Sequence, residues 1–167
     1  MKILNTAIVS LAILFSFSVS AADVKVDWVK PEQYKDIDAG GEGKSNFKKK
    51  LFKNLESVFA KGAKDLPNDY QLEVSMLDVD LAGHVDHSAG VMARRIITDS
   101  DFPRIIFYMI LRDDKGNIVF QGKQNLREKK MKHNSFRMKG SQSEFFMEKD
   151  LIEKWFEVAL VPAVAKA

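Results

Sequence analysis

Five side chains that could bind a metal ion or move protons crowd one short segment of the chain. They are three aspartates and two histidines: Asp78, Asp80, His84, Asp86 and His87. Asp78 and Asp80 are two residues apart on a predicted strand, so their carboxylates project from one face. Carboxylates and imidazoles together suit Zn, Mn or Ni, which makes a metal-dependent or acid–base hydrolase one hypothesis. The alternative, which we favour because the spacing fits no known metal motif, is a solvated strand end whose aspartates pair with Lys or Arg.

Two basic segments lie outside this acidic stretch, although the formal net charge of the chain is only +3. The first covers residues 44–53 and offers Lys48 and Lys49 as candidate binding residues. The candidates of the second, which covers residues 127–139, are Arg127, Lys129, Lys130 and Lys132. Basic patches attract anions, so an anionic envelope component is a candidate partner. The alternative is that both segments are solvated faces.

Other motifs exclude several functional classes. Gly43-Lys44-Ser45 resembles the end of a phosphate-binding loop, but Asp38 stands where that loop needs a further glycine. We therefore expect no bound nucleotide. No serine has the Gly-x-Ser-x-Gly context of a hydrolase. The chain contains no cysteine, which excludes disulfides and thiol chemistry. We expect no cofactor and favour a protein that is not an enzyme.

The first 21 residues have the layout of a secretory signal peptide. A basic start at Lys2 is followed by an apolar run over residues 7–19, and the run ends in small residues up to Ala21. The run is shorter than the roughly 20 residues that a membrane-spanning helix needs. We predict cleavage after Ala21, a periplasmic or secreted location, and a mature chain of one domain, residues 22–167, with no transmembrane segment.

Hydrophobic periodicity predicts the elements of that domain. Alternating residues 24–28 predict a strand, and a 3.6-residue period predicts a helix over residues 45–64 with Ser45 as its N-cap. Residues 70–81 predict a strand whose apolar phase flips at Met76-Leu77, which indicates a β-bulge that returns Leu77, Val79 and Leu81 to the apolar face.

Four more elements follow. Residues 94–98 suggest a short edge strand, and residues 104–111 and 118–125 predict a hairpin with its turn at 113–117. A wide apolar stripe predicts a last helix over residues 143–161, stopped by Pro162. The order is β-α-β-(β)-β-β-α, which predicts an α+β two-layer sandwich: two helices on a mostly antiparallel sheet of four to five strands. Trp28, Trp155 and Phe156 lie on apolar faces and are predicted to be core residues.

The strand at residues 104–111 is apolar on both faces. If both helices cover one face of the sheet, the other face needs a cover, because large exposed apolar patches mark contact sites. Two candidates could cover this face. One is the stretch of residues 83–101, and the other is a second copy of the chain in a symmetric homodimer through Tyr108 and Ile110.

Several segments resemble, in order and at similar spacing, a bacterial exported family catalogued as domain of unknown function 3016. The segments are Val26-Asp27-Trp28-Val29 with Pro31 and Tyr34, Asp78-Val79-Asp80-Leu81-Ala82-Gly83, Pro103-Arg104-Ile105-Ile106-Phe107, Gly122 with Asn125-Leu126, and Trp155-Phe156. The resemblance implies an exported bacterial domain and carries over no activity. Together with the composition, it favours a non-catalytic binding or scaffolding domain of the cell envelope.

Overall fold

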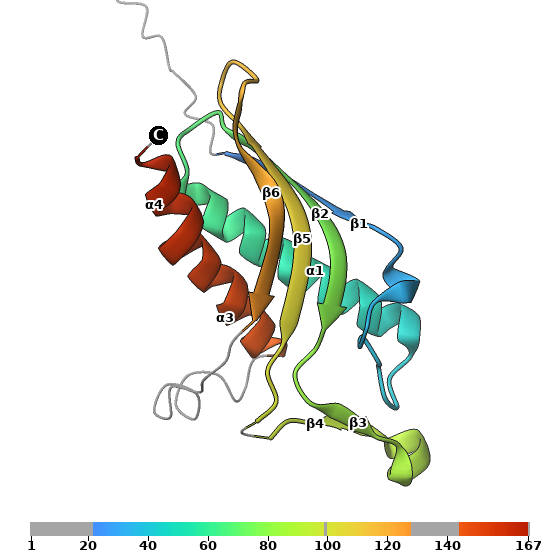
Figure 1. Cartoon of the computed structure of the whole chain (residues 1–167). Helices are drawn as coiled ribbons and strands as arrows, with labels where there is room; N and C mark the ends of the chain where they lie inside the picture. Colours follow the sequence, from blue (N-terminus) through green and yellow to red (C-terminus); the bar gives the residue numbers. More distant parts are fainter. Residues whose placement is uncertain (1–21, 99, 128–143, 167) are drawn as a thin grey trace, which may run out of the picture.

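A four-stranded sheet with helices against one face forms the body of the molecule (Figure 1). The computed structural model describes residues 22–98, 100–127 and 144–166, so the predicted signal peptide and Lys129, Lys130 and Lys132 lie outside the described residues. The strands, in their order across the sheet, are β1 (Asp23–Trp28), β2 (Gln71–Asp80), β5 (Arg104–Arg112) and β6 (Ile118–Arg127). The first pair is parallel and the others are antiparallel. The predicted α+β class is confirmed.

The two helical segments depart from prediction at their ends. α1 (Lys44–Gly62) begins after Gly43, so Ser45 lies inside the first turn and is not the N-cap. The last helix is α3 (Phe146–Trp155), continued by a π turn (Phe156–Leu160) and by α4 (Val161–Val164). Pro162 therefore lies in the first turn of α4 instead of ending the helix. Proline lacks an N–H group to donate to the preceding turn, and the chain reaches it through the wider π turn.

The predicted β-bulge in β2 is confirmed by a register shift against β5 between Met76 and Asp78. Its extra residue is Leu77, whose side chain is 37% exposed. The expectation that Leu77 joins Val79 on the core face is therefore wrong, because the bulged residue is the one left out of the alternation. The bulge keeps Val79 buried and leaves Asp78 and Asp80 only half-buried.

Aromatic rings fill the layer between the sheet and the helices. Phe59 of α1 is fully buried and lies edge-on to Phe107 of β5, with ring centroids 5.4 Å apart. Phe107 also meets Trp155 at 5.0 Å, edge to face. Such contacts stabilise beyond the burial of area alone. Trp155 and Phe156 are buried as predicted, while Trp28 is half-buried at the sheet edge, stacked on Phe52 at 3.8 Å.

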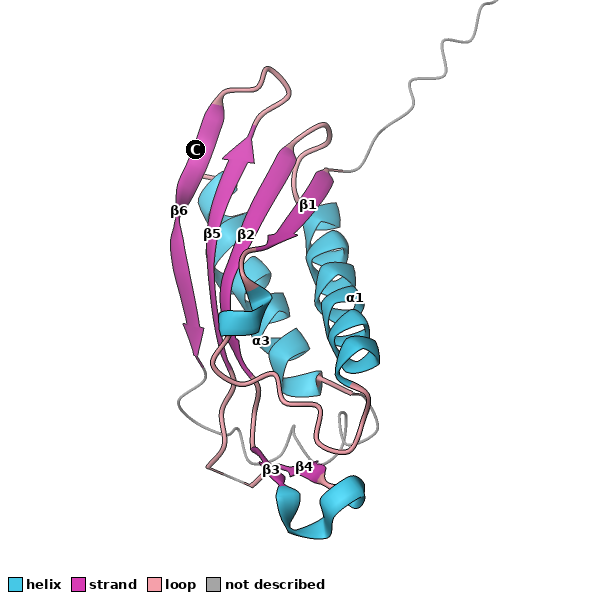
Figure 2. Ribbon diagram, turned by 90° about the vertical axis from the view of Figure 1, so that its right-hand side faces the viewer, coloured by secondary structure: helices cyan, strands magenta, loops and turns pink. Residues whose placement is uncertain are grey.

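A second, two-stranded sheet corrects the predicted strand order. β3 (His84–Asp86), which the sequence analysis missed, pairs with β4 (Arg94–Ile96), and a 3₁₀ segment (His87–Met92) joins them. The predicted edge strand therefore exists, but it does not join the main sheet. This β3–β4 hairpin projects beyond one end of the sheet and does not cover the face opposite the helices (Figures 1 and 2). Within the described ranges, no helix is long and apolar enough to cross a membrane.

Candidate functional site

Charged side chains gather where β2 ends and the β3–β4 hairpin begins. We call this cluster the polar junction and define it by seven residues: Lys35, Asp36, Asp38, Asp78, Asp80, Arg95 and Glu148. It joins the loop before α1, the end of β2, the hairpin and the start of α3.

Lys35 holds both aspartates of the β2 end. Its backbone N–H donates to Asp78 Oδ1 at 2.8 Å, and its Nζ lies 2.6 Å from Asp80 Oδ2. Both aspartates face the side of the sheet away from the helices, in line with the alternation beyond the bulge. This pairing matches the ion-pair hypothesis, with the difference that the cation comes from a loop and not from a neighbouring strand.

The histidines do not meet this aspartate pair. His87 Nε2 lies 2.9 Å from Asp38 Oδ2. His84 stands on β3 opposite Ile96 of β4, and Asp86 caps the 3₁₀ segment by accepting the N–H of Ser88 at 2.9 Å. Over residues 22–98, 100–127 and 144–166, no three His, Asp or Glu side chains are grouped closely enough to hold a metal ion. The five residues of the sequence cluster are therefore divided among separate contacts.

Arg95 is the centre of the polar junction. Its two terminal nitrogens donate to the two carboxylate oxygens of Asp36, at 2.8 and 2.9 Å, in a bidentate pair. They also donate to the carbonyls of Ala82, Gly83 and Asp38 at 3.1–3.3 Å. Nε is buried without a partner among the described atoms. Burial raises the pKa of Asp36, but the hydrogen bonds from Arg95 and from the Asp38 backbone outweigh it and hold that pKa below its ordinary value.

Glu148 contributes a buried carboxylate from α3. It is 4% exposed and accepts the N–H of Ala82 at 2.9 Å. Burial raises the pKa of Glu148, against the lowering effect of that hydrogen bond and of the Arg95 charge. The contact ties α3 to the strand end at Ala82, the same segment that Arg95 holds from the other side.

Two arginines face each other on the outer face of the sheet beside the junction. Arg104 of β5 is paired in register with Asp80 of β2 on one side and with Arg127 of β6 on the other. We call Lys35, Asp80, Arg104 and Arg127 the cationic row: Lys35 pairs with Asp80, and Arg104 and Arg127 follow on the next two strands, so the row holds three cations and one carboxylate. Arg104 Nε donates to the amide oxygen of Asn125 at 3.0 Å. Neither arginine forms an ion pair with any residue that the structure describes.

The structure therefore brings Asp80 and Arg127 into one row, with Asp78 adjacent to it. Lys48 and Lys49 lie elsewhere, on α1 in the helix layer, half-buried and exposed respectively. The neighbouring Lys50 of the same basic segment is bound to Glu42 and Glu144 at 2.9 and 2.8 Å. Arg127, the described residue of the second basic segment, therefore lies on a different surface from Lys48 and Lys49.

Sequence reasoning missed five residues of the junction: Lys35, Asp36, Asp38, Arg95 and Glu148. Glu148 carries a signal in the sequence, because a charged residue within the apolar stripe of a helix needs a buried partner. Arg95 and Asp36 are 59 residues apart, and nothing in local periodicity links them.

A comparison with models of protein families identifies the family of this chain. The family model described as "Protein of unknown function (DUF3016)" matches residues 22–158. The chain belongs to this family. Comparison with curated proteins finds no match.

Residues that carried the family resemblance support the strand ends. Tyr34 donates its hydroxyl to the carbonyl of Met76 at 2.8 Å, beside the bulge. The Asp78–Gly83 segment supplies two carboxylates to Lys35, an N–H to Glu148 and two carbonyls to Arg95. The family segment is therefore the segment on which the polar junction is built.

Proposed function

We propose that the protein is a non-catalytic binding or scaffolding domain of the bacterial cell envelope that holds a phosphate-bearing anionic component through the cationic row. Lys48 and Lys49 on α1 form a second, separate basic surface that adds general attraction for anions. The uncleaved chain reaches the envelope through its signal peptide.

The pairing of Arg104 with Arg127 carries this proposal. Like charges directly opposite each other on adjacent strands destabilise a sheet, and these two are neighbours on its outer face. An anion between them would remove the repulsion and accept hydrogen bonds from both planar guanidinium groups, which fit phosphate oxygens well. The carboxylate of Asp80 is already shared with Lys35, so the row keeps an excess of positive charge.

The hydrolase hypothesis loses the arrangement that motivated it. A hydrolase site built on this cluster needs the histidines close to Asp78 and Asp80, but His87 contacts Asp38. Both aspartates are engaged by Lys35. A binding role needs no such convergence, and the cationic row supplies its chemistry through the exposed Lys35 and Arg127 and the half-buried Arg104.

Export rests on residues 1–21 of the sequence and has its own test. The N-terminus of the protein purified from its native source should begin at Ala22. An intact Met1 on protein from the cytoplasmic fraction would contradict export, and the anionic partner would then have to be sought among cytoplasmic components.

Vesicle binding tests the anion site. We expect the purified residues 22–167 to co-sediment with phosphatidylglycerol vesicles and not with phosphatidylcholine vesicles, and to be released by salt. Each basic residue near an anionic surface contributes about 1 kcal/mol. Replacing both Arg104 and Arg127 with glutamine should therefore weaken binding by roughly tenfold or more.

Arg112→Gln is the matched control, because Arg112 lies at the opposite end of β5 and contacts Glu73 at 3.5 Å. It removes the same charge and should leave binding within about twofold. Equal losses in the control and in the double variant would show that net charge, and not the cationic row, attracts the vesicles. The variant Lys48→Gln/Lys49→Gln measures the share of the α1 surface.

A further inference from the structure

β1 leaves one edge of the main sheet open. It pairs with β2 on one side, and no other described strand pairs with its far side. The N–H of Asp23 donates to Tyr70, and that of Val29 donates to Met76, so odd-numbered residues face β2. Because alternate residues of a strand direct their N–H and C=O groups to opposite edges, those of Val24, Val26 and Trp28 face the open edge.

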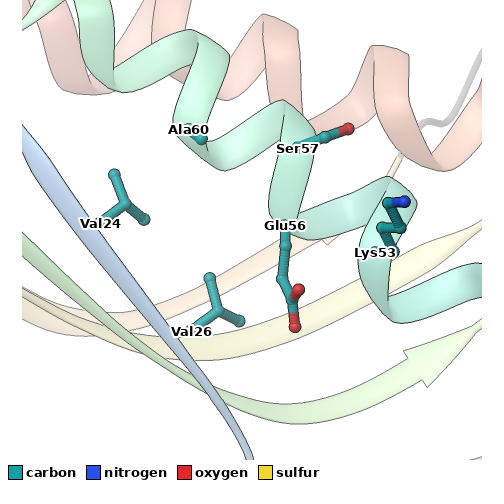
Figure 3. A pocket seen from close by; sticks show the side chains of 6 residues that line it. All are labelled: Val24, Val26, Lys53, Glu56, Ser57 and Ala60. Atoms are coloured by element: carbon teal, nitrogen blue, oxygen red, sulfur yellow. The ribbon is translucent and has the colours of Figure 1, made fainter. Parts of the chain in front are cut away.

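A groove of about 360 Å³ runs along this edge between β1 and α1. Its lining residues are Val24, Val26, Lys53, Glu56, Ser57 and Ala60. Figure 3 shows the two valines pointing from β1 toward α1, and Glu56 pointing from α1 back toward the strand. Trp28 fixes one end of the groove, since its indole N–H donates to Glu56 at 2.7 Å.

The charges on β1 restrict which strand can be added to this edge. Asp23, Lys25 and Asp27 are exposed on the face opposite the groove. Charged side chains on an edge strand usually prevent further pairing. The charges of β1 can nevertheless complement those of a second, antiparallel β1 strand. When the pair is centred on Val26, Lys25 of each copy lies opposite Asp27 of the partner subunit.

Neighbouring registers lack this complementarity. An antiparallel copy centred on Lys25 places the two Lys25 side chains opposite each other and Asp23 opposite the partner's Asp27. A copy centred on Asp27 places two aspartates opposite each other. Opposite charges across a strand pair stabilise it and like charges destabilise it. Of these three registers, only the one centred on Val26 pairs opposite charges. A copy centred on Val24 also places Lys25 opposite the partner's Asp23, but it leaves Trp28 outside the paired strands.

We propose that two copies of the protein associate through antiparallel pairing of their β1 strands, centred on Val26, into one continuous sheet. In this register the free N–H and C=O groups of Val24, Val26 and Trp28 are satisfied by the partner. On the groove side, Val26 meets the partner's Val26, and Val24 meets the partner's Trp28. Ser57 and Ala60 are small, so the two α1 helices can approach each other over the seam.

This contact differs from a dimer through the open sheet face. On that face, the apolar residues of β5 are Ile106, Tyr108 and Ile110. The flanking strands β2 and β6 present mainly charged and polar side chains, together with the exposed Leu77 and Ile118. The edge contact is short, because β1 has six residues, and we expect a weak interface in the smallest size class. Association should therefore appear at about 10–500 µM in sedimentation equilibrium, a range typical of weak affinities.

Charge exchange tests the register. Lys25→Asp and Asp27→Lys should each weaken dimerisation at least tenfold, since each places like charges opposite each other at two symmetric positions. The double variant Lys25→Asp/Asp27→Lys should recover the wild-type dissociation constant. A mixture of the two single variants should form a heterodimer, because their charges are then complementary across the seam.

Tyr108→Glu is the control for the sheet face and should leave the dissociation constant unchanged. Thermal melts of all variants establish that each is folded. The proposal would be overturned by a wild-type protein that stays monomeric at about 500 µM, the upper limit of the expected range. It would also be overturned if Tyr108→Glu abolished the dimer, or if the two charge changes failed to rescue each other.

Discussion

Arg95 and the Arg104–Arg127 pair place the same guanidinium group in opposite situations. The side chain of Arg95 is 16% exposed, and both of its terminal nitrogens donate to Asp36 and to backbone carbonyls. Arg104 stands beside Arg127, and the one side-chain acceptor it uses among the described residues is the uncharged amide of Asn125. An arginine whose donors are satisfied within the fold joins chain segments. Arginines that face one another with donors to spare are available to a ligand.

The position along the chain reinforces this contrast. Arg95 follows the β2 end by a hairpin, and its partners Asp36 and Ala82 come from two other segments. Arg104 and Arg127 are direct cross-strand partners in the main sheet, held by strand pairing and not by their own side chains. Removing the charge of Arg95 should therefore damage the fold, while removing that of Arg104 or Arg127 should damage only binding.

The largest effect is expected for Arg95→Ala. The substitution leaves Asp36 and three carbonyls without their donor in a partly buried place. Breaking a fully buried ion pair costs about 3–5 kcal/mol, and the 26% exposure of the Asp36 side chain reduces the expected loss to about 2–3 kcal/mol. Denaturant unfolding measures it. Arg94→Ala, on the exposed neighbour in β4, should cost less than about 0.5 kcal/mol. Equal losses for both arginines would contradict the role of Arg95.

A smaller effect, dependent on pH, is expected for Glu148→Gln. Burial raises the pKa of Glu148 in the folded protein above its unfolded value, so the folded state binds this proton more tightly. The resulting stability is complete below the ordinary glutamate pKa and is lost as the pH rises through the raised pKa. Glutamine keeps an oxygen acceptor for the N–H of Ala82. The variant should therefore lack this loss of stability with rising pH.

Melting temperatures between pH 4 and pH 8 measure the difference between the two proteins, a window that begins near the ordinary glutamate value. Glu157→Gln, on an exposed residue of the π turn, is the control and should follow the wild-type curve. Parallel curves for wild type and Glu148→Gln would show that Glu148 does not titrate differently in the folded state. Below about pH 4, the ordinary aspartate value, both should lose stability, because the lowered pKa of Asp36 makes its charge stabilising until it is protonated.

Periodicity predicted the elements of the main sheet and the phase of the bulge, because these depend on which face of each strand is apolar. The pairing of β3 with β4 was not predicted, because strands of three residues are too short to show an alternating pattern. The contacts of the polar junction were not predicted for a different reason. Its central pair joins residues 59 apart, and geometry of that kind exists only after the chain has folded. The cationic row was predicted in part. Asp80 and Arg127 were candidates from the sequence, but the pairing of Arg127 with Arg104 follows only from the strand register.

Titration of the arginine side chains by NMR tests the central claim most directly. Inorganic phosphate would be added to ¹⁵N-labelled residues 22–167 while the Nε–H signals of the arginines are followed. The account predicts saturable chemical-shift changes for Arg104 and Arg127. It predicts no change for Arg95 and little change for Arg112, which contacts Glu73. Small, uniform, non-saturating shifts at all exposed arginines would contradict a phosphate site at the cationic row.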